Sequence, residues 1–95
     1  MKIDYSRSFK KDYKKLALKL RNQFRERLAL FRENPFNPLL NNHSVHHPYD
    51  GCQSINISGD VRALFEIKNN NALFIRVGSH SELYIKVGVN KLCYR

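Results

Sequence analysis

The sequence predicts an α+β fold of two layers, in which a pair of helices packs on one face of a twisted antiparallel β-sheet. Two observations predict this class. Between Phe9 and Phe31, large apolar residues recur at close to 3.6-residue spacing, the period of an amphipathic helix. Between Cys52 and Gly78, apolar and polar residues alternate, as in half-buried strands. A sheet with one apolar face needs a cover, and the amphipathic helices can supply it.

The length and charge of the chain limit its organisation and its partners. Ninety-five residues suit one domain, so we expect a single domain over 1–95, with a core at 1–84 and a C-terminal extension at 85–95. Lys and Arg number 17 against 8 Asp and Glu. Eleven of these cations fall in residues 1–33, beside four acids. This excess indicates an acidic partner, which is RNA, DNA or an acidic protein.

The expected compartment is the cytoplasm. The chain has no long apolar run and no signal-peptide pattern, so neither a membrane nor secretion is expected. Cys52 and Cys93 lack CxxC spacing, which predicts small packing residues without a disulfide or a metal. No cofactor is expected.

The N-terminal third is predicted to form a strand and two helices. Residues 1–5 alternate like a short strand, and Ser6 or Ser8 can cap the helix that follows. Periodicity alone does not distinguish one long helix from two. However, about 25 helical residues would reach about 37 Å, longer than so small a domain is wide. We therefore expect a break near 18–21 and an αα-hairpin, ended by Asn34-Pro35.

The remainder is predicted to be a loop at 36–51 followed by three strands. The strands are expected at 52–58, 61–68 and 72–78, joined by turns at Gly59-Asp60 and at three asparagines. The alternation assigns these apolar residues to the face under the helices: Val61, Ala63, Phe65, Ile67, Leu73, Ile75 and Val77. The opposite face is predicted to be open and mostly basic, and to display Ser54, Asn56, Arg62, Glu66, Lys68, Phe74 and Arg76, although Phe74 also suits the core.

Arg76 and His80 are the first candidate site. Arg76 is a permanent cation at the end of the last strand, and His80 is a proton carrier in the predicted turn that follows Gly78. A fixed cation near a titratable imidazole suits chemistry on phosphate. The same pair is also compatible with an ordinary strand-end arginine and a turn histidine.

An ordered set of motifs carries a resemblance over nearly the whole chain up to Tyr84. The motifs are Ser8-Phe-Lys-Lys-Asp-Tyr-Lys-Lys-Leu16, Asn34-Pro-Phe-Asn-Pro38, His43-Ser-Val, Tyr49-Asp-Gly-Cys52, Asp60, and Arg76-Val-Gly-Ser-His-Ser-Glu-Leu-Tyr84. Together they resemble the RelE/ParE superfamily of bacterial toxins, and most closely its YafQ-like branch. The resemblance implies the toxin of a type II toxin–antitoxin system, which cleaves messenger RNA in the ribosomal A site without a metal. It also implies neutralisation by an acidic, DNA-binding antitoxin.

Carried onto this sequence, the resemblance implies a catalytic set of five residues. Arg76 would stabilise the charged phosphorane, and His80 would protonate the leaving oxygen. His43 or Asp60 would act as the base or hold the substrate, a choice that remains open. Tyr84 would stack on a base.

Further residues are expected to contact RNA without taking part in catalysis. Arg62, Asn56 and Lys68 are expected to line the open face. Lys10, Lys11, Lys14 and Lys15 lie on the first helix and are expected to contact ribosomal RNA through its backbone. The histidines at 43, 46, 47 and 80 are not expected to form a metal site, because no acid or thiol accompanies them in a loop.

The chain departs from the pattern it resembles at three positions. Asn56 stands where the branch usually has a histidine, Val61 where some relatives have tryptophan, and His47 where glycine is usual. Asn56 cannot exchange a proton near neutral pH, so catalysis is expected to be weakened. Two alternatives therefore remain: a ParE-like inhibitor of DNA gyrase, or a catalytically weak toxin that acts mainly through antitoxin binding. Arg76 and His80 favour the nuclease.

Overall fold

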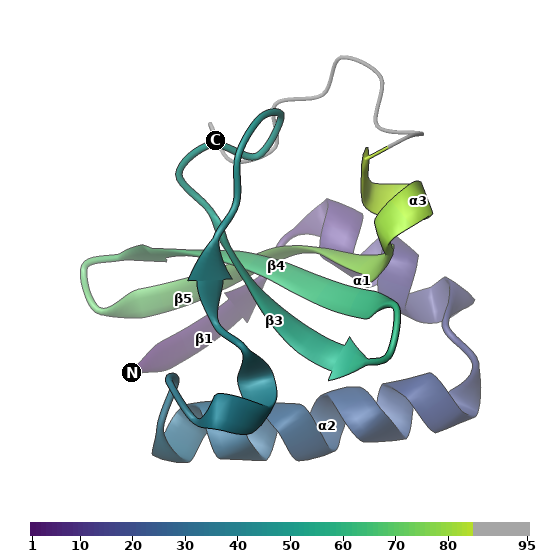
Figure 1. The fold of residues 1–95 in the computed structure, drawn as a ribbon, viewed down its shortest axis with the longest axis horizontal. Helices are drawn as coiled ribbons and strands as arrows, with labels where there is room; N and C mark the ends of the chain where they lie inside the picture. The colour runs from purple at the N-terminus through teal and green to yellow at the C-terminus, as the bar shows by residue number, and fades with distance from the viewer. Residues whose placement is uncertain (85–95) are drawn as a thin grey trace.

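The computed structural model describes residues 1–84, which form a helix pair, a five-stranded sheet and a short C-terminal helix (Figure 1). The elements are β1 (Lys2–Tyr5), α1 (Arg7–Lys15), α2 (Leu18–Glu33), the 3₁₀ turn η1 (Pro38–Leu40), β2 (His43–Ser44), β3 (Gln53–Ser58), β4 (Val61–Lys68), β5 (Asn71–Ser79) and α3 (His80–Tyr84). The predicted α+β class and the N-terminal strand are confirmed. The extension at 85–95 lies outside the described residues.

The sheet is mixed, with strand order β1-β5-β4-β3-β2. The three pairs β5-β4, β4-β3 and β3-β2 are antiparallel, but β1 runs parallel to β5, with Ile3 opposite Ala72. The prediction of a wholly antiparallel sheet is therefore wrong at this edge. Side-chain alternation does not encode the direction of a strand. No hairpin turn sets it for β1 either, because two helices and three strands separate β1 from β5 along the chain.

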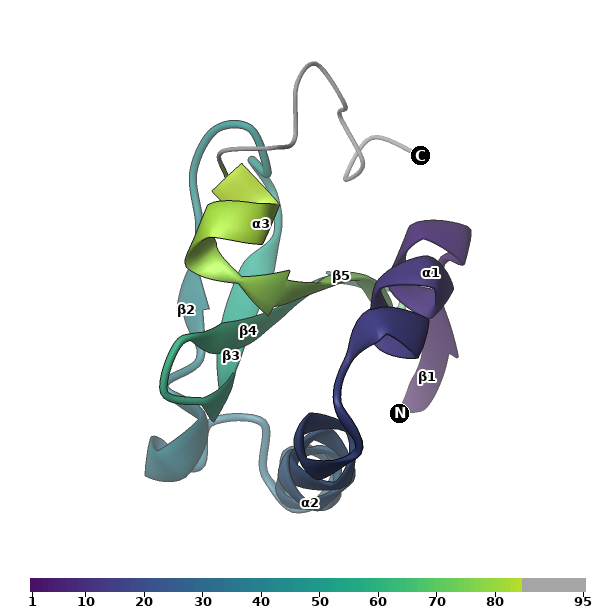
Figure 2. The same ribbon diagram turned by 90° about the vertical axis from the view of Figure 1, so that its right-hand side faces the viewer.

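The two helices form the predicted αα-hairpin. Ser6 caps α1, since its Oγ accepts a hydrogen bond from the Phe9 N–H (3.0 Å) and donates one to the Ile75 carbonyl of β5 (3.0 Å). Leu16 and Ala17 are extended, so the break comes slightly before the predicted position. In Figure 2, α2 runs along one side of the sheet. The short helix α3 lies on the other side.

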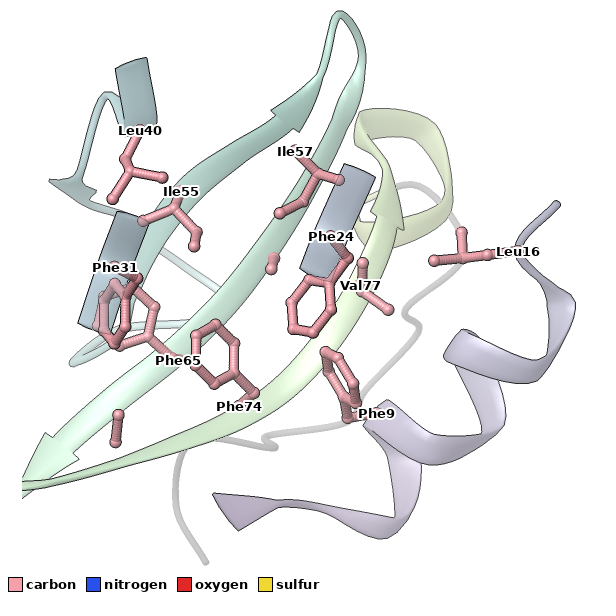
Figure 3. Packing of buried hydrophobic residues seen from close by; sticks show 12 residues of the cluster. Phe9, Leu16, Phe24, Phe31, Leu40, Ile55, Ile57, Phe65, Phe74 and Val77 are labelled. Atoms are coloured by element: carbon pink, nitrogen blue, oxygen red, sulfur yellow. The ribbon is translucent and has the colours of Figure 1, made fainter. Parts of the chain in front are cut away.

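Aromatic rings dominate the core between the helices and the sheet (Figure 3). Phe31 of α2 meets Phe65 of β4 edge-on, with ring centroids 5.0 Å apart. Phe24 meets Phe74 of β5 in the same way, at 5.8 Å. All four rings are almost fully buried, so the helix period read from the sequence does define this core.

A bulge in β5 changes which residues face the helices. Leu64 pairs with Arg76, but the next residue of β4 pairs with Phe74, so Ile75 is an extra residue in the ladder. Phe74 and Val77 therefore both lie in the helix-side core, and Ile75 lies in a second cluster. The predicted assignment of Ile75 to the helix side is wrong, because a bulge interrupts the alternation on which it relied. Of the two positions left open for Phe74, the structure shows the core.

This second cluster covers part of the face that was predicted to be open. It consists of Tyr49, Cys52, Leu64, Ile75 and Leu83, contributed by β4, β5, the loop before β3 and α3. The polar face is therefore narrower than predicted, and it is partly closed by the loop and by α3.

Cys52 has a bonding partner that the sequence analysis did not expect. It is buried, as predicted, but it is disulfide-bonded, so the expectation of no disulfide is wrong at this residue. Cys93 lies outside the described residues. Within residues 1–84, no helix is long and apolar enough to cross a membrane.

Candidate functional site

Arg76 is held at the end of β5 by partners from two other parts of the chain. Its Nε donates to Asp12 Oδ2 of α1 at 2.6 Å, and its Nη2 reaches Asp12 Oδ1 at 3.4 Å. Its Nη1 donates to the Tyr49 hydroxyl at 3.2 Å. The backbone N–H of Val77 donates to the same Asp12 oxygen at 3.1 Å. Asp12 therefore ties α1 both to the Arg76 side chain and to the strand beside it.

The charge of Arg76 is preserved despite its burial. The exposed fractions of the Arg76 and Asp12 side chains are only 14% and 16%. Burial by itself lowers the pKa of Arg76, but the hydrogen bonds and attraction from Asp12 and Tyr49 outweigh that effect and raise it. Three of the five guanidinium N–H groups are used by these two partners. The other two have no protein partner within residues 1–84 and are available to a ligand.

His80 begins a short helix rather than lying in a turn as predicted. A reciprocal capping box starts α3: Ser79 Oγ accepts from the Glu82 N–H (3.2 Å), and Glu82 Oε1 accepts from the Ser79 N–H (2.9 Å). Glu82 therefore caps α3. A Cβ at Gly78 would come within 2.8 Å of that Glu82 oxygen, so glycine leaves room for the cap. These contacts hold the His80 backbone while the side chain stays exposed.

His80 and Arg76 are connected through two tyrosines. The His80 ring lies 4.7 Å from the Tyr84 ring, and Tyr84 meets Tyr49 edge-on at 5.4 Å. The Tyr49 hydroxyl donates to the Leu83 carbonyl at 2.7 Å and accepts from Arg76. The guanidinium, the imidazole and a stacking ring thus belong to one connected set of side chains on the α3 side of the sheet.

Burial raises the pKa of both tyrosines of this set, Tyr49 and Tyr84, above the ordinary value of a tyrosine. A raised folded-state pKa stabilises the protein below the unfolded pKa, and this contribution is lost as the pH rises through the folded value. We expect the stability difference between the wild type and Tyr49→Phe to shrink above about pH 10. Urea unfolding of both proteins between pH 8 and pH 11 measures it. A constant difference across this range would contradict the expectation.

His43 and Asp60 occupy different places relative to this set. The pairs His43–Ser54, Ser54–Leu64 and Leu64–Arg76 form one row across the sheet. His43 therefore lies three strand spacings, or about 14 Å, from the Arg76 backbone. Asp60 is exposed in the turn before Val61. Because Val61 pairs with Ser79, Asp60 and His80 extend from the same end of neighbouring strands.

The three residues expected on the open face occupy different positions on β3 and β4. Asn56, Arg62 and Gly78 form a row across β3, β4 and β5. Arg62 Nη1 donates to the Gly59 carbonyl at 2.8 Å, and the side-chain oxygen of Asn56 is buried without a partner within residues 1–84. Lys68 lies six residues from Arg62 along β4, about 20 Å away. Lys68 therefore lies at the far end of β4 from Arg62, and its contact with RNA stays a prediction.

The four lysines of α1 also divide into separate groups. Lys10 and Lys14 line a groove of about 450 Å³ between α1 and α2, whose walls include Tyr5, Tyr13 and Leu28. Lys15 instead lines a cleft of about 280 Å³ that also contains Asp12, Leu16, Arg76, Val77 and Glu82. The helix period explains this division, because residues 10 and 14 lie on one flank of α1 and residues 12 and 15 on the other. All four lysines are exposed.

Two residues of the site were not identified from the sequence. Asp12 lies within a run of lysines, a context that indicates an exposed surface charge. Its partner, Arg76, is seen only in the packing of α1 on β5. Tyr49 belongs to a motif that was noted, but nothing in the sequence shows that it contacts both Arg76 and α3. Within residues 1–84, no three His, Cys, Asp or Glu side chains are grouped so that they could hold a metal ion.

The fold and these residues define a small α+β protein of the RelE-like toxin class. Solved structures of toxins share this fold. E. coli YafQ is 24% identical with a TM-score of 0.72, covering 86% of this chain and 96% of that one. A metal-bound toxin from Helicobacter pylori is 28% identical with a TM-score of 0.66, covering 88% and 99%. A YoeB/ParE toxin from Agrobacterium tumefaciens is 16% identical with a TM-score of 0.70, covering 84% and 99%.

Residues 1–85 match the family described as the bacterial toxin of type II toxin–antitoxin systems, YafQ. The chain belongs to this family, and it is a type II toxin. Another solved structure with this fold is YafQ in the E. coli DinJ–YafQ toxin–antitoxin complex, with 23% identity and a TM-score of 0.71. None of the curated proteins compared matches the chain.

Proposed function

We propose that this YafQ-family toxin is an endoribonuclease that cleaves messenger RNA on the ribosome, using its own side chains for each proton transfer. The observation that supports this proposal is the connected set in which Arg76, Tyr49, Tyr84 and His80 lie together on one side of the sheet. It combines a permanent cation that has free N–H groups with an exposed imidazole and an aromatic ring.

The reaction is a transesterification within the RNA. The ribose 2′-hydroxyl loses its proton and its oxygen attacks the adjacent phosphorus, while the bond from phosphorus to the 5′-oxygen breaks. The products are a 2′,3′-cyclic phosphate and a 5′-hydroxyl. His80 donates the proton that the leaving 5′-oxygen takes up. The two remaining N–H groups of Arg76 pair with the phosphate oxygens as negative charge develops, and Tyr84 stacks on an exposed base.

The base is assigned to one of two residues, His43 or Asp60. Asp60 extends from the same end of the sheet as His80, which favours a role close to the scissile phosphate. His43 is exposed, and its Nδ1 lies 2.7 Å from the Asn41 carbonyl. A neutral ring that donates from Nδ1 keeps Nε2 as a proton acceptor. Cleavage rates of His43→Gln and Asp60→Asn, measured from pH 5 to pH 9, separate the two roles, because only loss of the base removes the rise of rate with pH.

The proposed partners are the ribosome with its messenger RNA and a cognate antitoxin, all in the cytoplasm. For the antitoxin we propose an acidic, DNA-binding protein. The groove between α1 and α2 has apolar walls, with Lys10, Lys14 and Arg25 around it, and this charge suits an acidic amphipathic segment of the antitoxin.

Replacing the lysines in pairs is expected to separate the two partners. Lys11→Gln with Lys15→Gln should weaken ribosome binding and reduce the slope of log affinity against log salt by about 1 to 2. Lys10→Gln with Lys14→Gln should instead weaken antitoxin binding. Ribosome co-sedimentation and calorimetric titration, each at several salt concentrations, measure the two effects. Equal losses in both assays for both pairs would contradict the division.

The test of the proposed function is which synthesis stops first after brief induction in growing cells. The nuclease predicts early arrest of protein synthesis while DNA synthesis continues. Early DNA damage with translation intact would instead support a ParE-like gyrase inhibitor. A toxin that arrests neither, yet binds its antitoxin tightly, would be the catalytically weak form, for which Asn56 and Val61 are the candidate causes.

A further inference from the structure

We propose that Asp12 and Tyr49 are positioning residues for Arg76, and that Tyr49 also fixes Arg76 relative to the helix that carries His80. This inference rests on the proposed nuclease function. It adds two residues that contact the catalytic side chains without contacting the substrate.

The first part of the argument is the geometry of the Asp12 contact. Asp12 approaches Arg76 from the Nε side and engages Nε and Nη2 together. An arginine has several rotatable bonds, and a one-point contact would leave its plane free to turn. A two-point contact with a carboxylate fixes that plane. Asp12 is itself fixed, because it also accepts from the Val77 backbone N–H and because α1 is tied to β5 through Ser6.

The second part is the position of Tyr49. Its side chain is fully buried, and within the described part of the chain its hydroxyl accepts from Arg76 Nη1 and donates to the Leu83 carbonyl of α3. A phenylalanine at this position would keep the ring packing against Tyr84 but lose both hydrogen bonds. The hydroxyl of Tyr49 is thus the direct link between the guanidinium and α3.

The consequence concerns how the catalytic groups are arranged before RNA binds. With Asp12 on one side and Tyr49 on the other, the remaining N–H groups of Arg76 have a defined direction. A pre-oriented donor costs no reorganisation when the phosphorane forms. Asp12 also offsets the positive charge of Arg76. We therefore expect the loss of Asp12 to lower the cleavage rate more than the affinity for RNA.

The first experiment measures the ordering of Arg76 without an activity assay. In ¹⁵N NMR spectra of the free toxin, the Arg76 Nε–H signal should exchange slowly with water. Asp12→Asn should speed its exchange about tenfold or more, and Tyr49→Phe should speed it less. Rapid exchange already in the wild type would overturn the inference, whether or not the protein cleaves RNA.

The second experiment measures single-turnover cleavage of messenger RNA placed in the A site of purified ribosomes. We expect Tyr49→Phe and Asp12→Asn each to lower the maximal rate about tenfold, since small misplacements of catalytic groups are costly, with half-saturation changed less than about twofold. Asp4→Asn removes an exposed carboxylate from β1, outside the connected set, and serves as the matched control. Wild-type rates for both site variants, in a preparation whose wild type is active, would overturn the inference alone. An inactive wild type would overturn the proposed function instead.

A double-mutant cycle separates positioning from a general effect on folding. If Asp12 acts through Arg76, Asp12→Asn should have no further effect on the rate in an Arg76→Ala background. Its effect on stability should change sign there, because Arg76→Ala leaves the Asp12 carboxylate unpaired and asparagine removes that charge. Equal and additive losses of rate in both backgrounds would overturn the positioning role.

Discussion

Replacing His80 by glutamine is expected to lower the rate of RNA cleavage by about 10²–10⁴-fold, the usual contribution of a general acid. Glutamine retains hydrogen-bonding capacity but does not deliver a proton near neutral pH. The fold should not change, because Ser79 and Glu82 cap α3 through contacts that do not involve the His80 ring. Single-turnover cleavage on ribosomes and growth after induction measure the loss, and thermal unfolding checks the fold.

His46→Gln is the matched control for this experiment. His46 is also exposed, and it lies in the loop before β3, outside the connected set. We expect this variant to cleave at the wild-type rate. A His80→Gln protein that remains fully toxic and fully active would remove His80 from the mechanism.

Replacing Arg76 by alanine is expected to have the second large effect. The rate should fall by about 10²–10³-fold, the loss seen when one donor to a developing charge is removed. The free energy of unfolding should also fall, by about 1–3 kcal/mol, because the poorly exposed Asp12 carboxylate loses its partner. Cleavage assays at a temperature where the variant stays folded separate these two losses, and urea unfolding measures the second.

Arg76→Lys provides the sharper comparison. Lysine keeps the positive charge but lacks the planar fork that engages Asp12 and Tyr49 at the same time. We therefore expect most of the rate loss to persist although the charge is restored. Cleavage at the wild-type rate by Arg76→Ala would exclude charge stabilisation by this residue. Cleavage at the wild-type rate by Arg76→Lys would exclude a need for the planar fork.

The parts of the fold that follow from local periodicity could be predicted from the sequence. The spacing of Phe9, Phe24 and Phe31 predicts the helix-side core, and the length limit predicts the αα-hairpin. Ser6 as a cap and Glu82 as a cap follow from capping chemistry, which acts within a few residues. These features depend on neighbours along the chain, so the sequence contains the information needed to predict them.

The parts that depend on distant pairing could not be predicted in this way. The bulge at Ile75 reverses the alternation for the residues around it, and no local pattern marks it. The loop that brings Tyr49 over the sheet closes part of a face that alternation alone leaves open. The same limit applies to the site. Arg76 and His80 were found by their chemistry, whereas Asp12 is 64 positions from Arg76 in the sequence and was found only in the structure.

The central claim is that Arg76 and His80 act together to cleave RNA. Mapping the 5′ ends of cellular transcripts a few minutes after induction tests it most directly, with the His80→Gln protein expressed to the same level in parallel. The mechanism predicts new ends inside coding regions, bearing a 5′-hydroxyl, in the wild type and their absence in the variant. Transcripts that stay intact in the wild type, or new ends that appear equally in both strains, would contradict it.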